Sequence, residues 1–150
     1  MSRIVYVNGD YLPEEDAKVS IFDRGFLFAD GVYEVTSVLG GKLLDFDGHA
    51  KRLWRSLAEL EMESPVTEEE VLEIHRQLVE RNGVDEGLVY LQVTRGAAAK
   101  RDHAFPEGVE PTVFVMSSPM HADRDSDREP GIHAITLDDI RWEHCNVKAI

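Results

Sequence analysis

The sequence predicts an α+β domain in which a largely antiparallel sheet is covered by helices on one face. Two turn signals near the N-terminus, Asn8-Gly9 and Gly40-Gly41, each separate a pair of β-rich segments. Two stretches with helical spacing of their apolar residues follow, and three more β-rich segments come after them. Hairpins, then helices, then strands are typical of the α+β class.

The first part of the chain predicts two hairpins. Apolar residues dominate 4–7, and the Asn-Gly pair behind them tolerates the positive φ angles of a type I′ turn. Residues 22–31, FDRGFLFADG, combine glycines with charges and indicate an irregular turn. Residues 33–39 then form a strand, and 42–46 return beside it.

Two helices are predicted in the middle of the chain. Asp47 is the expected N-cap of the first. Thr67 and Glu70 have the spacing of a capping box, and the helix they open would stop at Asn82-Gly83. The apolar positions of the first helix recur every three or four residues: Ala50, Leu53, Trp54, Leu57 and Leu60.

Three strands and two long loops complete the pattern. The strands are expected over 88–95, 112–118 and 132–137, which are rich in β-branched and aromatic residues. The loops cover 96–111 and 119–131. Loops of such length inside a compact domain tend to be functional or mobile, so the first is a candidate for a functional site.

Composition limits the function classes. The formal net charge of −13 repels nucleic acid, and no apolar run is long enough to cross a membrane. The single Cys145 excludes an internal disulfide and fits a reducing compartment, so we expect a soluble, cytoplasmic protein. The histidines and this cysteine form neither a CxxC nor an HExxH spacing, so we expect no metal site.

The loop of 96–111 contains the first candidate site. Arg101 and His103 are two residues apart on either side of Asp102, so both can point the same way. A guanidinium beside an imidazole suits a carboxylate ligand. The alternative is an ordinary solvated loop.

Three more residues each allow both a functional and an ordinary structural interpretation. Arg52 follows His49 on one side of a helix start and could bind phosphate or could simply be exposed. Tyr33 begins a strand, where its hydroxyl could face a pocket or a core partner. Lys148 becomes a nucleophile where burial lowers its pKa, but a lysine near a chain end is ordinarily solvated.

Four segments, taken together, resemble one enzyme family. They are ADGVYEVTSVLGGKLLDFDGHAKRLWRSL, VYLQVTRG, RDHAFP and DDIRWEHCNVK, and the likeness runs from about residue 4 to residue 150. Their order and spacing resemble the D-amino acid aminotransferases among the fold-type IV pyridoxal-phosphate enzymes. The GVYE, HxxRL and final lysine motifs belong to the wider superfamily, whereas the RxH loop points to the D-amino acid branch.

The resemblance implies a role for each candidate. Lys148 matches the lysine that binds pyridoxal 5'-phosphate covalently and moves a proton at the substrate α-carbon. Arg52 matches the arginine that reaches the cofactor phosphate. Tyr33, Arg101 and His103 match the groups that bind the substrate carboxylate, the last two being contributed by the other subunit of a homodimer. The implied reaction moves the amino group of a D-amino acid such as D-alanine to 2-oxoglutarate, giving a 2-oxo acid and D-glutamate.

The resemblance also implies a domain plan. Residues 1–120 would form the N-terminal domain, like the small domain of fold-type IV enzymes, 121–131 an interdomain connection, and 132–150 the start of a second domain with Lys148. In the family that second domain supplies the acidic partner of the pyridine nitrogen and backbone amides for the phosphate. We therefore expect this chain to be the N-terminal part of a longer enzyme, with the C-terminal domain absent.

Two alternatives stay open. Another fold-type IV activity, a branched-chain L-amino acid aminotransferase or an aminodeoxychorismate lyase, would share Lys148 and Arg52 but bind its substrate differently. Arg101 and His103 argue against both. The second alternative is a non-catalytic fragment that serves in folding or dimerisation and binds no cofactor.

Overall fold

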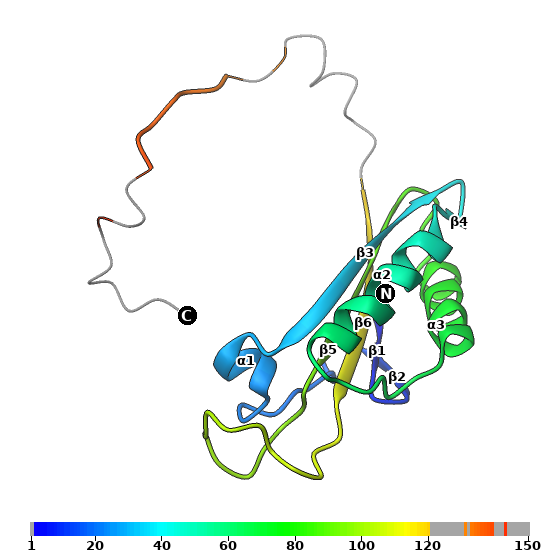
Figure 1. Ribbon diagram of the computed structural model, residues 1–150. Coiled ribbons are helices and arrows are strands. Elements are labelled where there is room, and N and C mark those ends of the chain that lie inside the picture. The colour runs from blue at the N-terminus through cyan, green and yellow to red at the C-terminus, as the bar shows by residue number, and fades with distance from the viewer. Residues whose placement is uncertain (1, 121–130, 132, 140–142, 144–150) are drawn as a thin grey trace. The chain divides into compact units, whose positions relative to one another are not determined.

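A computed structural model describes residues 2–120, 131, 133–139 and 143, and Figure 1 shows its course. By its internal contacts the chain divides into two units, Met1–Met120 and His121–Ile150. All helices and strands of the described residues lie in the first unit. None of the helices found among the described residues is long and apolar enough to span a membrane.

The first unit is built on one six-stranded sheet. Its strand order is β2-β1-β6-β5-β3-β4, and every neighbouring pair is antiparallel, which confirms the predicted sheet. The strands are β1 Ile4–Val7, β2 Asp10–Pro13, β3 Gly31–Leu39, β4 Lys42–Leu43, β5 Gly87–Thr94 and β6 Thr112–Pro119.

Two long helices cover one face of this sheet (Figure 1). They are α2, Phe46–Glu59, and α3, Glu68–Arg81, and their apolar sides pack on the strands. Along β5 every second residue from Gly87 to Val93 is buried while those between are half-buried, because successive side chains of a strand point to opposite faces. The most completely buried core side chains are Leu78, Val89, Leu91, Val93 and Val115.

The helix ends agree in part with the sequence prediction. The Thr67 hydroxyl accepts from the Glu70 N–H while the Glu70 carboxylate accepts from the Thr67 N–H, so the capping box is confirmed. The predicted cap of α2 at Asp47 is wrong, because the helix already begins at Phe46 behind Asp45. Asp47 lies in the first turn instead, where its charge favours the helix dipole.

Three segments differ from the predicted elements. Residues 22–31 contain a short helix, α1, Arg24–Phe28, which the Asp23 carboxylate caps at the Gly25 N–H. The return strand of the second hairpin is only Lys42–Leu43, because the chain bends at residues 44 and 45 and α2 begins at Phe46. Residues 133–137 of the expected strand 132–137 belong to no strand, since no described segment pairs with them, and 132 lies outside the described residues.

His75 is a polar side chain inside the core, with 2 % of its surface exposed. Its Nδ1 donates to the Val71 carbonyl at 2.8 Å, and its ring meets the edge of Phe46 with centroids 5.3 Å apart. Burial lowers the pKa of His75 to about 4, against the opposing effect of the Val71 hydrogen bond. The imidazole is therefore neutral in the folded protein at neutral pH.

We expect this histidine to make stability depend on pH. An unfolded His75 has a pKa near 6.5, so between pH 6.5 and about 4 the unfolded chain binds more protons and the free energy of unfolding falls as the pH falls. The fall amounts to about 2 kcal/mol between pH 7.5 and pH 5. Urea unfolding at both pH values measures it. His75→Leu should remove most of the fall, whereas His133→Leu, at an exposed position, should not, and an unchanged fall in His75→Leu would contradict the assignment.

Candidate active site

The N-terminal end of β3 carries the GVYE motif. Gly31 starts the strand so close to β5 that an added Cβ would lie 2.6 Å from the Val93 carbonyl oxygen, so only glycine fits there. Tyr33 and Glu34 follow and point to opposite faces. Tyr33 is 65 % exposed, whereas Glu34 is 5 % exposed under the helix layer.

Glu34 binds the arginine and histidine of α2. Its Oε1 accepts from Arg52 Nε at 2.5 Å, and its Oε2 accepts from Arg52 Nη2 at 2.6 Å. His49 Nδ1 lies 2.8 Å from the same Oε2. Burial alone would raise the pKa of Glu34, but the hydrogen bonds from Arg52 and then His49 outweigh it and hold the pKa below its usual value. Glu34 is thus a carboxylate that orients the side chains of Arg52 and His49.

This arrangement suits an oxyanion such as a phosphate. The Arg52 side chain is 56 % exposed although Glu34 below it is buried. Arg52 Nη1 has no acceptor among the described residues, so one edge of the guanidinium stays open to a ligand while the other edge is fixed. The Glu34 hydrogen bonds and charge raise the pKa of Arg52, which keeps it charged. A fixed, charged fork with free donors is well suited to binding a phosphate.

Tyr33 lies on the sheet face opposite the helices. Its ring stacks on Tyr90 of β5 with centroids 5.7 Å apart, and Tyr90 meets Phe114 of β6 at the same centroid distance. Tyr90 donates its hydroxyl proton to Gln92, whereas the Tyr33 hydroxyl has no hydrogen-bond partner among the described residues. This exposure excludes the interpretation of Tyr33 as a core tyrosine. Its hydroxyl is available to a ligand.

Arg101 and His103 lie together on the long loop. The Arg101 guanidinium is 4.5 Å from the centroid of the Phe28 ring, and the His103 ring centroid is 5.2 Å from it. Both side chains are exposed, so their polar groups remain accessible to a ligand. Two donors from one loop therefore meet on one aromatic ring of α1.

The predicted residues form two groups within residues 2–120. Arg52 joins Glu34 and His49 in the first, whereas Tyr33 points to the other sheet face and stacks on Tyr90. Arg101 and His103 form the second, and among the described residues no hydrogen bond or ion pair connects it to the first. Lys148 lies outside the described residues.

Sequence reasoning missed Glu34, although it stands inside the GVYE motif. A glutamate whose two neighbours in the strand are apolar or aromatic carries a signal, because a charge on the buried side of a strand needs a partner. The partner, Arg52, is 18 residues away and on another element, so the local pattern could not identify it.

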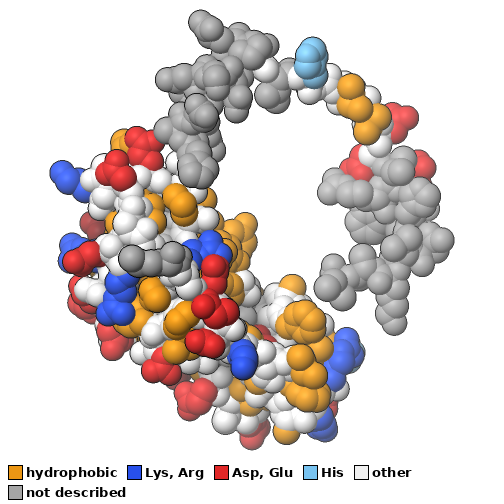
Figure 2. Space-filling view, turned by 180° about the vertical axis from the view of Figure 1, so that it is seen from behind, with side chains coloured by type: hydrophobic (Ala, Val, Ile, Leu, Met, Phe, Trp, Pro, Cys, Tyr) orange, Lys and Arg blue, Asp and Glu red, His pale blue; other side chains and the backbone are white. Residues whose placement is uncertain are grey.

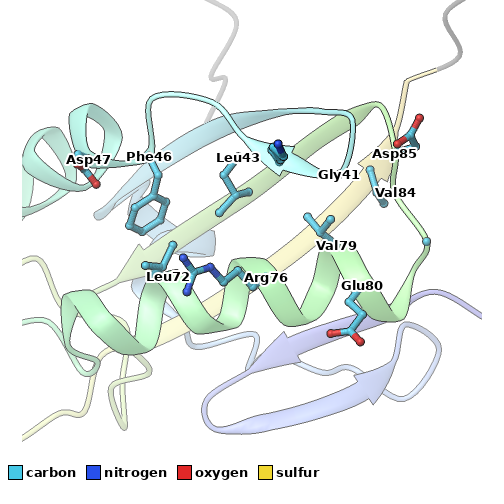
Figure 3. Close-up of a pocket in the computed structure, with 12 residues that line it drawn as sticks. Gly41, Leu43, Phe46, Asp47, Leu72, Arg76, Val79, Glu80, Val84 and Asp85 are labelled. Carbon is cyan, nitrogen blue, oxygen red and sulfur yellow. The ribbon is translucent and has the colours of Figure 1, made fainter.

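A groove of about 680 Å³ lies elsewhere, between α3 and the hairpin that joins β3 to β4. In Figure 3 the side chains of Leu43 and Phe46 point toward α3, which carries Leu72, Arg76 and Glu80. This hairpin is at the other end of β3 from Tyr33, and none of the predicted site residues that the structure describes lines the groove.

Comparison with known proteins identifies similar chains. The family model described as amino-transferase class IV matches residues 31–150. D-alanine aminotransferases of Staphylococcus epidermidis and Staphylococcus aureus are 40 % and 38 % identical over 97 % of this chain. A D-alanine aminotransferase of Listeria monocytogenes is also 38 % identical. The chain spans about half the length, 51 %, of these relatives.

Solved structures agree with the fold. A branched-chain amino acid aminotransferase of Escherichia coli matches with a TM-score of 0.73 at 17 % identity, over 80 % of this chain and 40 % of that one. A branched-chain amino acid aminotransferase from T.th., solved with pyridoxamine 5'-phosphate, matches with the same TM-score at 25 % identity, over 81 % of this chain and 41 % of that one. The sheet and its helix layer therefore correspond to one part of these enzymes.

Proposed function

The chain belongs to the class IV aminotransferase family, and from this premise we propose that the protein is a pyridoxal-phosphate-dependent aminotransferase that acts on D-amino acids. It would move the amino group of a D-amino acid such as D-alanine to 2-oxoglutarate. The observation that carries the proposal is the meeting of Arg101 and His103 on the Phe28 ring, since this pair distinguishes a D-amino acid site within the family pattern.

Arg52 and Glu34 would hold the cofactor phosphate. The open Nη1 edge of Arg52 supports this role, and Glu34 fixes the other edge of the guanidinium. When bound, pyridoxal 5'-phosphate supplies the electron-accepting ring that stabilises negative charge at the substrate α-carbon. The contact of Arg52 with the phosphate would keep the cofactor in one place.

Three side chains would bind the substrate carboxylate. Arg101 and His103 would donate hydrogen bonds, the Arg101 guanidinium would add positive charge, and the exposed Tyr33 hydroxyl would add a donor. When the carboxylate is held on one side, D- and L-amino acids present their α-hydrogens on opposite faces of the α-carbon. These contacts would therefore select one enantiomer. Lys148 would bind the cofactor covalently and move the proton at the α-carbon, first accepting and then returning it.

We further propose a homodimer in which the loop of 96–111 serves the active site of the other subunit. Large apolar side chains are exposed on and around α1, a region where orange side chains gather in Figure 2. A group of this kind favours a contact with another protein surface. The exposed side chains of this region are Val19, Ile21, Phe22, Phe26 and Phe105.

A comparison of the two enantiomers of alanine tests the proposed function. The protein as the cell makes it receives pyridoxal 5'-phosphate, 2-oxoglutarate and either D- or L-alanine, and pyruvate is measured. We expect pyruvate from D-alanine at a rate at least about 100-fold above that from L-alanine, because the L-enantiomer held by the same carboxylate contacts misplaces its α-hydrogen.

The opposite preference would contradict the proposal and favour a branched-chain L-amino acid aminotransferase. Activity with neither enantiomer, together with no visible absorption band from added cofactor, would favour the non-catalytic dimerisation fragment.

A further inference from the structure

A buried arginine, Arg24, and a half-buried one, Arg95, share one aspartate beneath the loop of 96–111. Arg24 is 4 % exposed, and its Nε donates to Asp30 Oδ2 at 2.7 Å. Arg95 Nε donates to both carboxylate oxygens of Asp30, at 3.1 and 2.9 Å. Burial alone would raise the pKa of Asp30, but the hydrogen bonds from Arg95 and Arg24 hold it below its usual value. Two cations and one anion leave donors that need further acceptors.

The spare donors of Arg24 hold the loop itself. Its Nη1 donates to the carbonyl oxygen of Asp102 at 2.7 Å and to that of Ala104 at 3.3 Å. These two carbonyls stand on either side of His103. One guanidinium nitrogen therefore restrains the backbone before and after the histidine, at a sequence distance of 78 to 80 residues.

Aromatic contacts connect the same arginine to the exposed donors. The Arg24 guanidinium carbon lies 4.7 Å from the centroid of Phe28, the ring that Arg101 and His103 also contact. Arg95 lies 4.1 Å from the centroid of Phe105, which follows on the loop. The loop therefore contacts the charged group of Arg24, Asp30 and Arg95 in two ways, through its backbone and through the rings of Phe28 and Phe105.

We propose that Arg24 is a positioning residue that sets Arg101 and His103 in place for the substrate carboxylate. This inference rests on the proposed function of that pair. Arg24 does not bind substrate itself, because it is buried and directs its donors to Asp30 and the loop carbonyls. An arginine fork directs separate nitrogens at a carboxylate and at two carbonyls, whereas a lysine ammonium presents all its donors from one nitrogen.

Replacement of Arg24 tests the proposal in the protein as the cell makes it, loaded with cofactor. In Arg24→Met we expect the KM for D-alanine to rise about 10- to 100-fold, because a loosened loop misplaces its donors, while the visible absorption band of bound cofactor stays unchanged. Trypsin should cleave faster after Lys100 and Arg101. The control is Arg3→Met, which removes an exposed arginine paired with Glu14 and should change none of these readouts.

Arg24→Lys separates positioning from folding. It keeps a positive charge beside Asp30 yet loses the second carbonyl contact, so we expect a raised KM and faster tryptic cleavage without a lower melting temperature. If KM stays unchanged in Arg24→Lys, or rises only together with loss of the cofactor band and of the melting transition, the proposal is overturned.

The proposed function can fail separately. If the unaltered protein does not transaminate D-amino acids, faster cleavage after Arg101 in Arg24→Lys at an unchanged melting temperature still supports Arg24 as the residue that holds this loop. Equal cleavage rates in Arg24→Lys and the unaltered protein overturn that role, whether or not the protein transaminates D-amino acids.

Discussion

Replacing Lys148 with alanine is expected to lower amino transfer from D-alanine by roughly ten-thousand-fold or more, because one side chain would lose both a covalent and a proton-transfer role. A neutral lysine amine attacks carbonyl carbon and can then carry a proton at the substrate α-carbon. Alanine does neither. The measurements are the pyruvate formation rate and the visible absorption band after addition of pyridoxal 5'-phosphate.

Two control variants narrow the interpretation of that result. Lys148→Arg keeps the positive charge but provides no neutral amine at neutral pH, so it should be as inactive as the alanine variant. Lys18→Ala removes an exposed lysine and should leave rate and band unchanged. A Lys148→Ala protein that retains most of its activity would show that the assigned lysine does not carry the reaction.

Replacing Arg101 with leucine is expected to raise the KM for D-alanine about 10- to 100-fold, since hydrogen bonds to a charged group contribute about 1.5–3 kcal/mol. The leucine keeps an apolar contact with Phe28 and removes only the cation. A carboxylate contact made equally in the ground and transition states changes KM more than kcat. The control is Arg81→Leu, which removes an arginine 4.2 Å from the Tyr11 ring on another part of the domain. Unchanged KM in Arg101→Leu would exclude the carboxylate role.

Mixing the two impaired chains tests the homodimer. If the loop serves the other subunit, a dimer of one Lys148→Ala chain and one Arg101→Leu chain contains one site with native lysine and native arginine. Co-expression should then restore up to half of the normal activity per dimer at the normal KM. If both residues act within one chain, every site stays impaired and no low-KM activity returns.

The parts of the fold that the sequence predicted correctly depend on neighbours a few residues apart. The Asn8-Gly9 pair predicted the first hairpin because the chemistry of a turn is local. The Thr67–Glu70 capping box predicted the start of α3 for the same reason. Residues 133–137 of the expected strand belong to no strand, because a strand exists only beside a partner, and a β-rich composition does not supply one.

For the candidate site residues, too, the sequence indicated some features and only the folded structure showed the others. Family motifs in the sequence pointed to Tyr33, Arg52, Arg101 and His103, and the described structure adds what those residues contact. It pairs Arg52 with Glu34 and puts Arg101 beside His103 on Phe28. Arg24 carried no local signal at all, since it stood in a segment that looked like an irregular charged turn.

The sequence alone therefore determined the fold class, the family and the identity of the candidate groups, because these depend on residue types at short or fixed spacings. Only the tertiary structure decided which charges are buried, which partners they share and which loop they hold. Arg24 meets its carbonyl acceptors 78 and 80 residues away, and only folding brings such groups within hydrogen-bond distance. Burial makes these hydrogen bonds important, because a guanidinium removed from water requires acceptors for its donors.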